Sequence, residues 1–417
     1  MDGLTTRAAS EALPRSWAPG LTRVPYWVYH DPAVARAEQA RIFQGPVWNF
    51  LCLEVEIRTT GDYRTTFVGE MPVVVVRGKN GAVHAFENRC AHRGALICLE
   101  NCGSAKDFTC VYHAWRYDLA GNLTSVAFRH GVNGQGGMPA DFDMRQHGPR
   151  KLRTATFCGL VFGTLSADAP PLEEFIGDPI AARVRRVLRK PVEIIGTFTQ
   201  PLPNNWKLYI ENVKDTYHAS LLHLFFTTFR ITRLSQGGGI VVSEDGAHHA
   251  SATLAPPQAA DTTYRDAGLR SDSASFRLAD PSLLEIRDEW GDGIQLQILS
   301  LFPAFVLQQI HNCLAVRHIV PRGTDAMDLH WTYLGFADDT PDMRALRLKQ
   351  CNLVGPAGFV SMEDGCVGGF VQRGTGTAEA SESVVEMGGA GAESQTTRAT
   401  EAAVRGFWKT WRRLMEL

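Results

Sequence analysis

Two short motifs, each pairing one cysteine with one histidine, constrain this chain more than any other feature. The segment "NRCAHRGAL" contains Cys90 and His92, and "FTCVYHAW" contains Cys110 and His113, with residues 93–109 between the pairs. Short apolar runs and Gly, Asn and Asp turns surround both motifs, a pattern that indicates loops between β-strands. Two thiols and two imidazoles presented by such loops indicate a metal centre in a small antiparallel β domain.

The mixed pairs favour one kind of metal centre. Structural zinc sites usually present C-x-x-C or H-x-x-x-H pairs, so zinc is an alternative, as is a coincidental placement of these residues. In a Rieske [2Fe–2S] cluster one iron takes two thiolates and the other takes two imidazoles, so each of two facing loops supplies one ligand of each kind. We therefore expect a [2Fe–2S] cluster at Cys90, His92, Cys110 and His113.

Charge and composition limit the class of partner. The 417 residues include 42 Lys and Arg against 44 Asp and Glu, without a long run of either sign, which predicts no binding to nucleic acid or to a membrane surface. No window approaches the roughly 20 apolar residues of a membrane span, and the first residues lack a signal-peptide pattern. The nine cysteines are scattered and odd in number, unlike a secreted disulfide framework. These features predict a cytoplasmic protein that binds small molecules and other proteins.

The hydrophobic periodicity changes along the chain. Short β-type runs dominate from about residue 40 to 160, and the pattern after that is mixed. Helical patterns cover 171–189, 205–229, 341–354 and 398–416, and strand-like runs cover 293–302, 305–320 and 328–337. His248 and His249 stand in a polar stretch and are expected at the surface. The sequence therefore predicts an α+β fold, with a small β domain followed by a larger mixed domain.

The order of four motifs resembles a known enzyme family. After "CAHRGA" and "CVYHAW" come "NNWKLYIENVKDTYHASLLH" and "GPAGFVSMEDG". Over nearly its full length the chain resembles the large (α) subunit of Rieske non-haem iron aromatic-ring-hydroxylating oxygenases. The resemblance implies an N-terminal segment, 1–40, packed on the catalytic domain, a Rieske domain at 41–160, and a catalytic mononuclear iron domain at 161–417. It also implies a central antiparallel sheet flanked by helices, of the helix-grip type.

The resemblance implies that His218 and His223 are ligands of Fe(II), because with one carboxylate they complete a facial triad. On a regular helix, residues i and i+5 lie about 140° apart, so both rings reach one iron only where the helix bends, widens or ends. For the carboxylate, "SMEDG" offers Glu363 and Asp364. The match to the family motif selects Asp364, with Glu363 as the alternative.

Asp215 lies three residues before His218 on the same helical face, so it is expected to hydrogen-bond a ligand imidazole. In the family, the matching aspartate links the cluster of one subunit to the iron of its neighbour. The resemblance therefore implies that Asp215 bridges His113 of one chain and His218 of another, with a role in catalysis.

Two arginines point to the substrate. Within the family the chain most resembles the branch that oxidises terephthalate, through "GVNGQGGMPA", "RLSQGGG" and "MEDGCVGGFVQRG". In that branch two arginines anchor the two carboxylates of the substrate, and the matching positions are Arg317 and Arg398. A solvent-facing arginine at a helix start is the alternative reading of Arg398. The expected reaction is cis-dihydroxylation of terephthalate, and the alternative is hydroxylation of an ortho-substituted benzoate such as salicylate or anthranilate.

The source of electrons is expected outside this chain. No G-x-G-x-x-G stands between a strand and a helix, so NAD(P)H and flavin are expected on a separate reductase. The resemblance also implies a small β subunit in an α3β3 assembly. An electron carrier and a zinc-stabilised binding module are the alternatives from other classes, but the long region after the cluster motif argues against a carrier.

Overall fold

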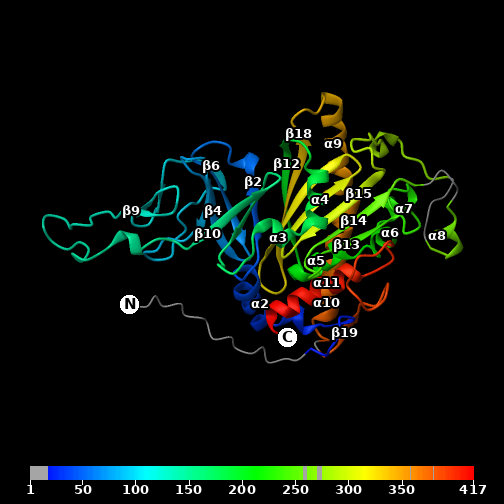
Figure 1. Cartoon of the computed structure of the whole chain (residues 1–417), viewed down its shortest axis with the longest axis horizontal. Helices are drawn as coiled ribbons and strands as arrows, with labels where there is room; N and C mark the ends of the chain where they lie inside the picture. The colour runs from blue at the N-terminus through cyan, green and yellow to red at the C-terminus, as the bar shows by residue number, and fades with distance from the viewer. Residues whose placement is uncertain (1–16, 257–260, 270–274, 357, 379) are drawn as a thin grey trace.

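The computed structural model describes residues 17–256, 261–269, 275–356, 358–378 and 380–417. Two seven-stranded sheets organise this part of the chain, one built from residues 49–164 and one from residues 192–336. Figure 1 shows the first sheet and its long loops on one side, with the second sheet and most of the helices on the other. The predicted α+β fold class is confirmed.

The first sheet is antiparallel and carries a three-stranded extension that holds the second Cys/His motif. Its strands, in spatial order, are β2 (Asn49–Leu53), β11 (Leu160–Thr164), β10 (Lys151–Phe157), β5 (Val83–Glu87), β4 (Met71–Arg77), β3 (Asp62–Val68) and β6 (Cys102–Ser104). The extension consists of β7 (Phe108–Thr109), β8 (Arg116–Tyr117) and β9 (Leu123–Ser125). A small apolar core between the sheet and the extension includes Phe86, Phe108, Trp115 and Tyr117.

The second sheet is also antiparallel and forms the floor of the larger domain. Its strands, in spatial order, are β12 (Val192–Leu202), β18 (Met327–Phe336), β17 (Cys313–Pro321), β16 (Phe305–Ile310), β15 (Ile294–Leu301), β14 (His249–Leu254) and β13 (Gly238–Val242). Its central strands are buried at nearly every position because both faces of the sheet are covered.

Helices and the first domain cover the two faces of this sheet. One face packs against α5 (Trp206–Lys214), α9 (Pro341–Val354) and α11 (Ala402–Met415), as the shared apolar core shows. The other face packs against α4 (Asp178–Val187) and the strands β2 and β11; Phe50 and Phe305, for example, have ring centroids 4.7 Å apart. The sheet is therefore a shared wall between the domains.

Apart from α10 (Phe359–Thr375), which carries Asp364, the remaining described helices and strands are short. They include β1 (Arg23–Pro25), α1 (Trp27–His30), α2 (Pro32–Glu38), a π-helical turn (Gln39–Phe43), α3 (Leu172–Ile176), α6 (Ala219–Leu222), α7 (Leu224–Thr228), α8 (Thr263–Asp266) and β19 (Glu382–Val384). β1 pairs with β19 near the C-terminal helix, where Trp17 contacts Trp408 at a centroid distance of 5.2 Å. Among the described helices, none is long and apolar enough to cross a bilayer.

Two expectations about local structure were wrong, and one helix was not predicted. The run 305–320 is two strands joined by a hairpin, because His311 takes a positive φ of 51° and reverses the chain. The helix that was not predicted is 359–375, whose glycines disfavour a helix. A Cβ atom at Gly365 or Gly368 would lie under 3 Å from the side chain of Leu202 or Asn204, so glycine lets this helix pack closely against them.

The second wrong expectation concerns His248 and His249, which are fully buried rather than at the surface. His249 begins β14, which lies between β13 and β15 in the sheet. His248 Nδ1 accepts a hydrogen bond of 3.0 Å from the backbone N–H of Phe302, and burial lowers its pKa to about 4. A polar run in the sequence is therefore no guide to exposure once its polar atoms find partners inside the protein.

Candidate active site and metal centres

The helical pattern predicted over 205–229 is broken at the two histidines. α5 ends at Lys214, and the next carboxylate, Asp215 Oδ1, accepts hydrogen bonds from the backbone N–H groups of Tyr217 at 2.8 Å and His218 at 3.3 Å. Side-chain capture of backbone N–H groups competes with continuation of the helix. The chain resumes in α6 and breaks again at His223, so the predicted distortion between the histidines is confirmed.

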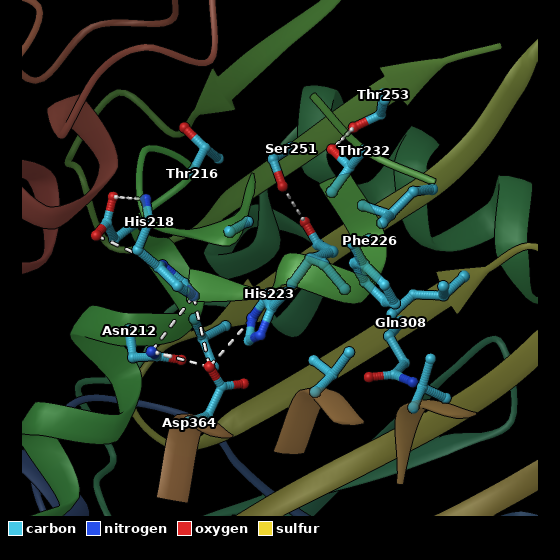
Figure 2. A pocket seen from close by; sticks show the side chains of 18 of the residues that line it. Asn212, Thr216, His218, His223, Phe226, Thr232, Ser251, Thr253, Gln308 and Asp364 are labelled. Carbon is cyan, nitrogen blue, oxygen red and sulfur yellow. Dashed lines mark hydrogen bonds and ion pairs between the residues drawn. The ribbon is translucent and has the colours of Figure 1, made fainter. Parts of the chain in front are cut away.

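These breaks bring His218, His223 and Asp364 together. One nitrogen or oxygen from each residue lies within 4.8 Å of the others. Asp364 Oδ1, from α10, is 3.5 Å from His218 Nε2 and 3.3 Å from His223 Nε2, as Figure 2 shows. Two imidazoles and one carboxylate that converge from different elements are the donor set of a non-haem Fe(II) facial triad, so these residues fit that metal.

Electrostatics also favour a cation at this site. Burial disfavours the charged form of His218, but Asp215 and Asp364 outweigh burial and raise its pKa to about 10. Burial likewise opposes the charged form of His223, but Asp364 and Glu363 outweigh burial and raise its pKa. Burial alone raises the pKa of Asp364, yet the two imidazoles hold it well below its usual range. The site thus stabilises added positive charge.

Residues around the triad orient its members. Glu363 Oε2 lies 2.7 Å from His223 Nδ1, so it orients that ring with Nε2 toward Asp364. Asp215 Oδ2 lies 3.4 Å from His218 Nδ1 on the opposite side of that ring from Asp364. The first contact gives Glu363, the alternative ligand, a different position from that of Asp364.

Asn212 is a site residue that the sequence reasoning missed. Its Nδ2 donates to Asp364 Oδ1 at 3.2 Å and lies 3.4 Å from His218 Nε2. The available signal was its position three residues before Asp215, which places a second polar side chain on the same face of α5.

The Cys/His motifs lie on two facing loops of the first domain. Cys90 and Cys110 are buried, whereas His92 and His113 are exposed and have ring centroids 4.4 Å apart. The indole of Trp115 stacks on His92 at 4.8 Å.

The spread of these four residues bears on the metal they hold. In the described part of the chain, the ligand atoms of His218, His223 and Asp364 lie within 4.8 Å of one another, whereas those of the four Cys/His residues form no such compact group. Four ligands of a single tetrahedral zinc would meet that limit, since Zn–S and Zn–N bonds are about 2.0–2.3 Å long. The arrangement suits a larger, two-iron cluster.

The candidate active site opens into a cavity between the helices and the second sheet. Its wall includes the three residues of the triad together with Arg317 and Arg398. The sheet supplies one wall of the cavity, through side chains of β14, β15, β16 and β18. A substrate in this cavity would therefore lie on the sheet with the triad at one side.

Both arginines are buried, and neither meets a carboxylate within the described part of the chain. Arg317 is 6% exposed, donates to Tyr209 Oη at 2.7 Å, and lies 5.0 Å from the Trp331 ring. Arg398 is 4% exposed and lies in the loop before α11, which excludes the solvent-facing alternative. It donates to Thr232 Oγ1 at 2.7 Å, and burial lowers its pKa to about 10. The Nε atom of each guanidinium has no described hydrogen-bond partner.

Family comparisons agree with this two-centre arrangement. A family model described as the Rieske [2Fe–2S] domain matches residues 47–133, and one described as the ring hydroxylating alpha subunit (catalytic domain) matches residues 183–417. The chain belongs to the family of ring-hydroxylating α subunits of Rieske oxygenases. It is a Rieske-type aromatic-ring-hydroxylating oxygenase, and its two domains imply a [2Fe–2S] cluster and a mononuclear iron.

Several characterised proteins are similar over almost their whole length. The chain is 60% identical over 394 residues to the terephthalate 1,2-dioxygenase terminal oxygenase component subunit alpha 2 of Comamonas sp, covering 94% of this chain and 95% of that protein. It is 47% identical over 395 residues to the anthranilate 1,2-dioxygenase large subunit of Burkholderia cepacia, covering 94% of this chain and 93% of that protein. It is 38% identical over 402 residues to the salicylate 5-hydroxylase large oxygenase component of Ralstonia sp, covering 95% of each.

A solved structure shows the same fold. Naphthalene 1,2-dioxygenase from Rhodococcus sp., bound to indole, has a TM-score of 0.78 at 24% identity, covering 94% of each chain. The prediction of a Rieske oxygenase with two kinds of iron centre is confirmed by these comparisons. The assignment of individual ligands stays a prediction that the geometry above supports.

Proposed function

We propose that this chain is the α subunit of a terminal oxygenase that cis-dihydroxylates terephthalate to a cis-dihydrodiol. The observation that carries the proposal is the pair of buried guanidinium groups, Arg317 and Arg398, in the cavity that contains the candidate iron ligands. A buried guanidinium is costly without an anion, and neither arginine meets a carboxylate within the described residues. The two para carboxylates of terephthalate supply two anions at opposite ends of one ring.

Similarity supports the same substrate class. The 60% identical Comamonas protein is named for terephthalate, whereas the relatives named for anthranilate and salicylate are 47% and 38% identical. Anthranilate and salicylate each carry one carboxylate, which needs a single guanidinium. Oxidation of an ortho-substituted benzoate is the second candidate, and Arg398 is the residue that separates the two.

Each group in the cavity has a defined task in this reaction. His218, His223 and Asp364 would hold Fe(II), and this iron would supply the activation of O2. Cys90, His92, Cys110 and His113 would hold the [2Fe–2S] cluster, which would supply electrons. Arg317 and Arg398 bind the two carboxylates and thereby fix which edge of the ring faces the triad. Apolar side chains hold the ring faces and exclude water; they include Phe226, Leu296, Ile298, Ile310 and Val354.

Electron delivery involves a second copy of the chain in this proposal. The Asp215 side chain is 23% exposed while it faces His218, and the cluster histidine His113 is exposed on its own domain. A carboxylate with one side on an iron ligand and the other accessible can accept a hydrogen bond from a neighbour's His113. We assign Asp215 this bridging role, in an α3β3 assembly with a small β subunit and with a separate reductase that binds NAD(P)H and flavin.

Product identification tests the proposal. The purified oxygenase, supplied with a compatible reductase and NADH, is given terephthalate, salicylate or 2-aminobenzoate under identical conditions. A cis-dihydrodiol from terephthalate, formed faster than any product of the other two acids, is the expected result. A parent protein that prefers either monocarboxylate refutes the proposed substrate.

A variant of Arg398 tests the basis of this selectivity. Losing one buried charged contact costs about 2–4 kcal/mol, so Arg398→Ala is expected to lower kcat/KM for terephthalate by about 30- to 1,000-fold. Arg405→Ala is the matched control, because Arg405 is buried on α11 but hydrogen-bonds only backbone carbonyls outside the cavity. It is expected to lower thermal stability without changing the ratio of activities on terephthalate and benzoate.

A further inference from the structure

A buried glutamine in the cavity wall has no task in the reaction described above. Gln308, on β16, is 1% exposed and lines the same cavity as the triad and the two arginines. Its Nε2 has no hydrogen-bond partner within the described residues. Buried amide N–H groups are almost always paired, so an unpaired one at a ligand cavity points to a partner that the ligand supplies.

Strand register fixes where Gln308 stands relative to the arginine. Val306 pairs directly with Arg317 across β16 and β17, and Gln308 lies two residues along β16 from Val306. Gln308 and Arg317 therefore point to the same face of the sheet as diagonal neighbours. Such neighbours are about 7–8 Å apart at the backbone, which is within reach for two long side chains. One carboxylate can thus contact both.

The row of residues that contains Gln308 lies in the middle of the cavity floor. It runs from Ser251 through Ile298 to Gln308 across three adjacent strands. Thr253 and Ile310 lie in the next row on one side, and Arg317 lies in the next row on the other side. Figure 2 shows the Gln308 side chain among the lining residues, across the cavity from Asn212. A ring lying on this floor has Gln308 beside the end that Arg317 binds.

The next residue along the strand shows what a structural glutamine looks like in this sheet. Gln309 is also 1% exposed but faces the other side. Its Nε2 donates to the carbonyl oxygen of His311 at 2.9 Å and of Gln295 at 3.2 Å, and its Oε1 accepts from Arg186 at 2.9 Å. Its amide is fully used by the protein, whereas that of Gln308 is not.

We propose that Gln308 is a substrate-binding residue whose amide donates a hydrogen bond to the substrate carboxylate held by Arg317. The inference rests on the proposed function, since it assigns a further contact to the ligand of the same cavity. A carboxylate has about four lone-pair sites, so it accepts from a guanidinium and an amide together. Rotation about the last side-chain torsion brings the amide nitrogen to whichever side the carboxylate occupies.

The test is calorimetric titration of terephthalate and of benzoate into the anaerobic, iron-loaded oxygenase. Gln308→Met keeps the size of the side chain but removes the donor, and it is expected to raise Kd for both acids by about 10- to 100-fold. Gln308→Glu places an anion beside the carboxylate and is expected to raise both Kd values further. Gln309→Met, the matched control, is expected to lower Tm while each Kd stays within about twofold of the parent value.

The outcomes separate the two proposals. If Gln308→Met, or Gln308→Glu where the methionine variant does not fold, binds both acids as tightly as the parent, the role of Gln308 is wrong. Equal losses of affinity in Gln308→Met and Gln309→Met reduce Gln308 to a packing residue and also overturn the proposal. A parent protein that binds benzoate but not terephthalate refutes the proposed substrate instead. The benzoate titrations then still test the role of Gln308.

Discussion

Separate substitutions of Glu363 and Asp364 test which carboxylate of α10 is the iron ligand. Glu363 Oε2 contacts His223 Nδ1 at 2.7 Å, whereas Asp364 Oδ1 lies within 3.5 Å of Nε2 on both His218 and His223. Only Asp364 therefore faces the point where the two Nε2 atoms converge. Glu363 instead selects the tautomer and orientation of His223 from its far side.

The geometry predicts different losses for the two variants. Removing a carboxylate that orients a ligand histidine typically weakens metal binding by 10- to 100-fold, or about 1.4–2.7 kcal/mol. Because the Glu363 side chain is 29% exposed and water can replace part of its contact, Glu363→Ala is expected near the lower end of this range. Glu363→Gln keeps an acceptor and should lose less. Asp364→Ala removes one of three ligands and is expected to leave no stoichiometric iron at this site.

Anaerobic titration of Fe(II) into protein depleted of mononuclear iron measures these losses. The visible absorbance of the [2Fe–2S] cluster, which lies in the other domain, reports the amount of folded protein in each sample. The reasoning is wrong if Glu363→Ala loses iron as completely as Asp364→Ala. It is equally wrong if Asp364→Ala binds one Fe(II) with the affinity of the parent.

Three further variants address electron transfer and stability. Asp215→Ala is expected to retain both iron centres but to lose nearly all turnover; normal turnover, measured with reductase in excess, contradicts the bridging role. Tyr117→Phe removes a hydroxyl that lies 3.1 Å from Cys90 Sγ. Because hydrogen bonds to the ligand sulfurs raise the reduction potential of a cluster, this potential should fall by about 40 mV in protein-film voltammetry. An unchanged potential excludes this hydrogen bond. Lys207→Met leaves the buried carboxylate of Glu38 without its ion-pair partner, which lies 2.7 Å away. The free energy of unfolding, measured in urea, should fall by about 3–5 kcal/mol. A fall of less than about 1 kcal/mol shows that other groups satisfy the carboxylate.

Helices were predicted correctly where nearby residues, such as a cap, determine them, and were missed where tertiary packing does. The helix predicted at 341–354 matches α9, because Thr340 caps it and Pro341 occupies its first position. The helix over 359–375 was missed, because its glycines are explained only by close packing against Leu202 and Asn204. The break at His223 was anticipated from the chemistry of two histidines on one metal, whereas the break after Lys214 was not predicted.

The candidate site shows the same division. The sequence identified His218 and His223 as one group, and the family motif selected Asp364, which the structure places beside both. The sequence could not tell Glu363 from a ligand, since its role depends on which ring nitrogen it contacts. Nor could "LQQI" show which glutamine faces the cavity, because that depends on strand register and on which face of the sheet is covered.

The layers of the larger domain divide its two tasks. The candidate iron ligands come from the broken segment after α5 and from α10, whereas one wall of the cavity comes from alternate residues of the central sheet. Substitutions along the sheet can therefore alter which aromatic acid is accepted while the metal-binding geometry stays intact. Divergence within such a lineage would be expected to concentrate on the inward-facing positions of β14 to β17, and a laboratory library confined to those positions should yield new substrate ranges at little cost in iron content.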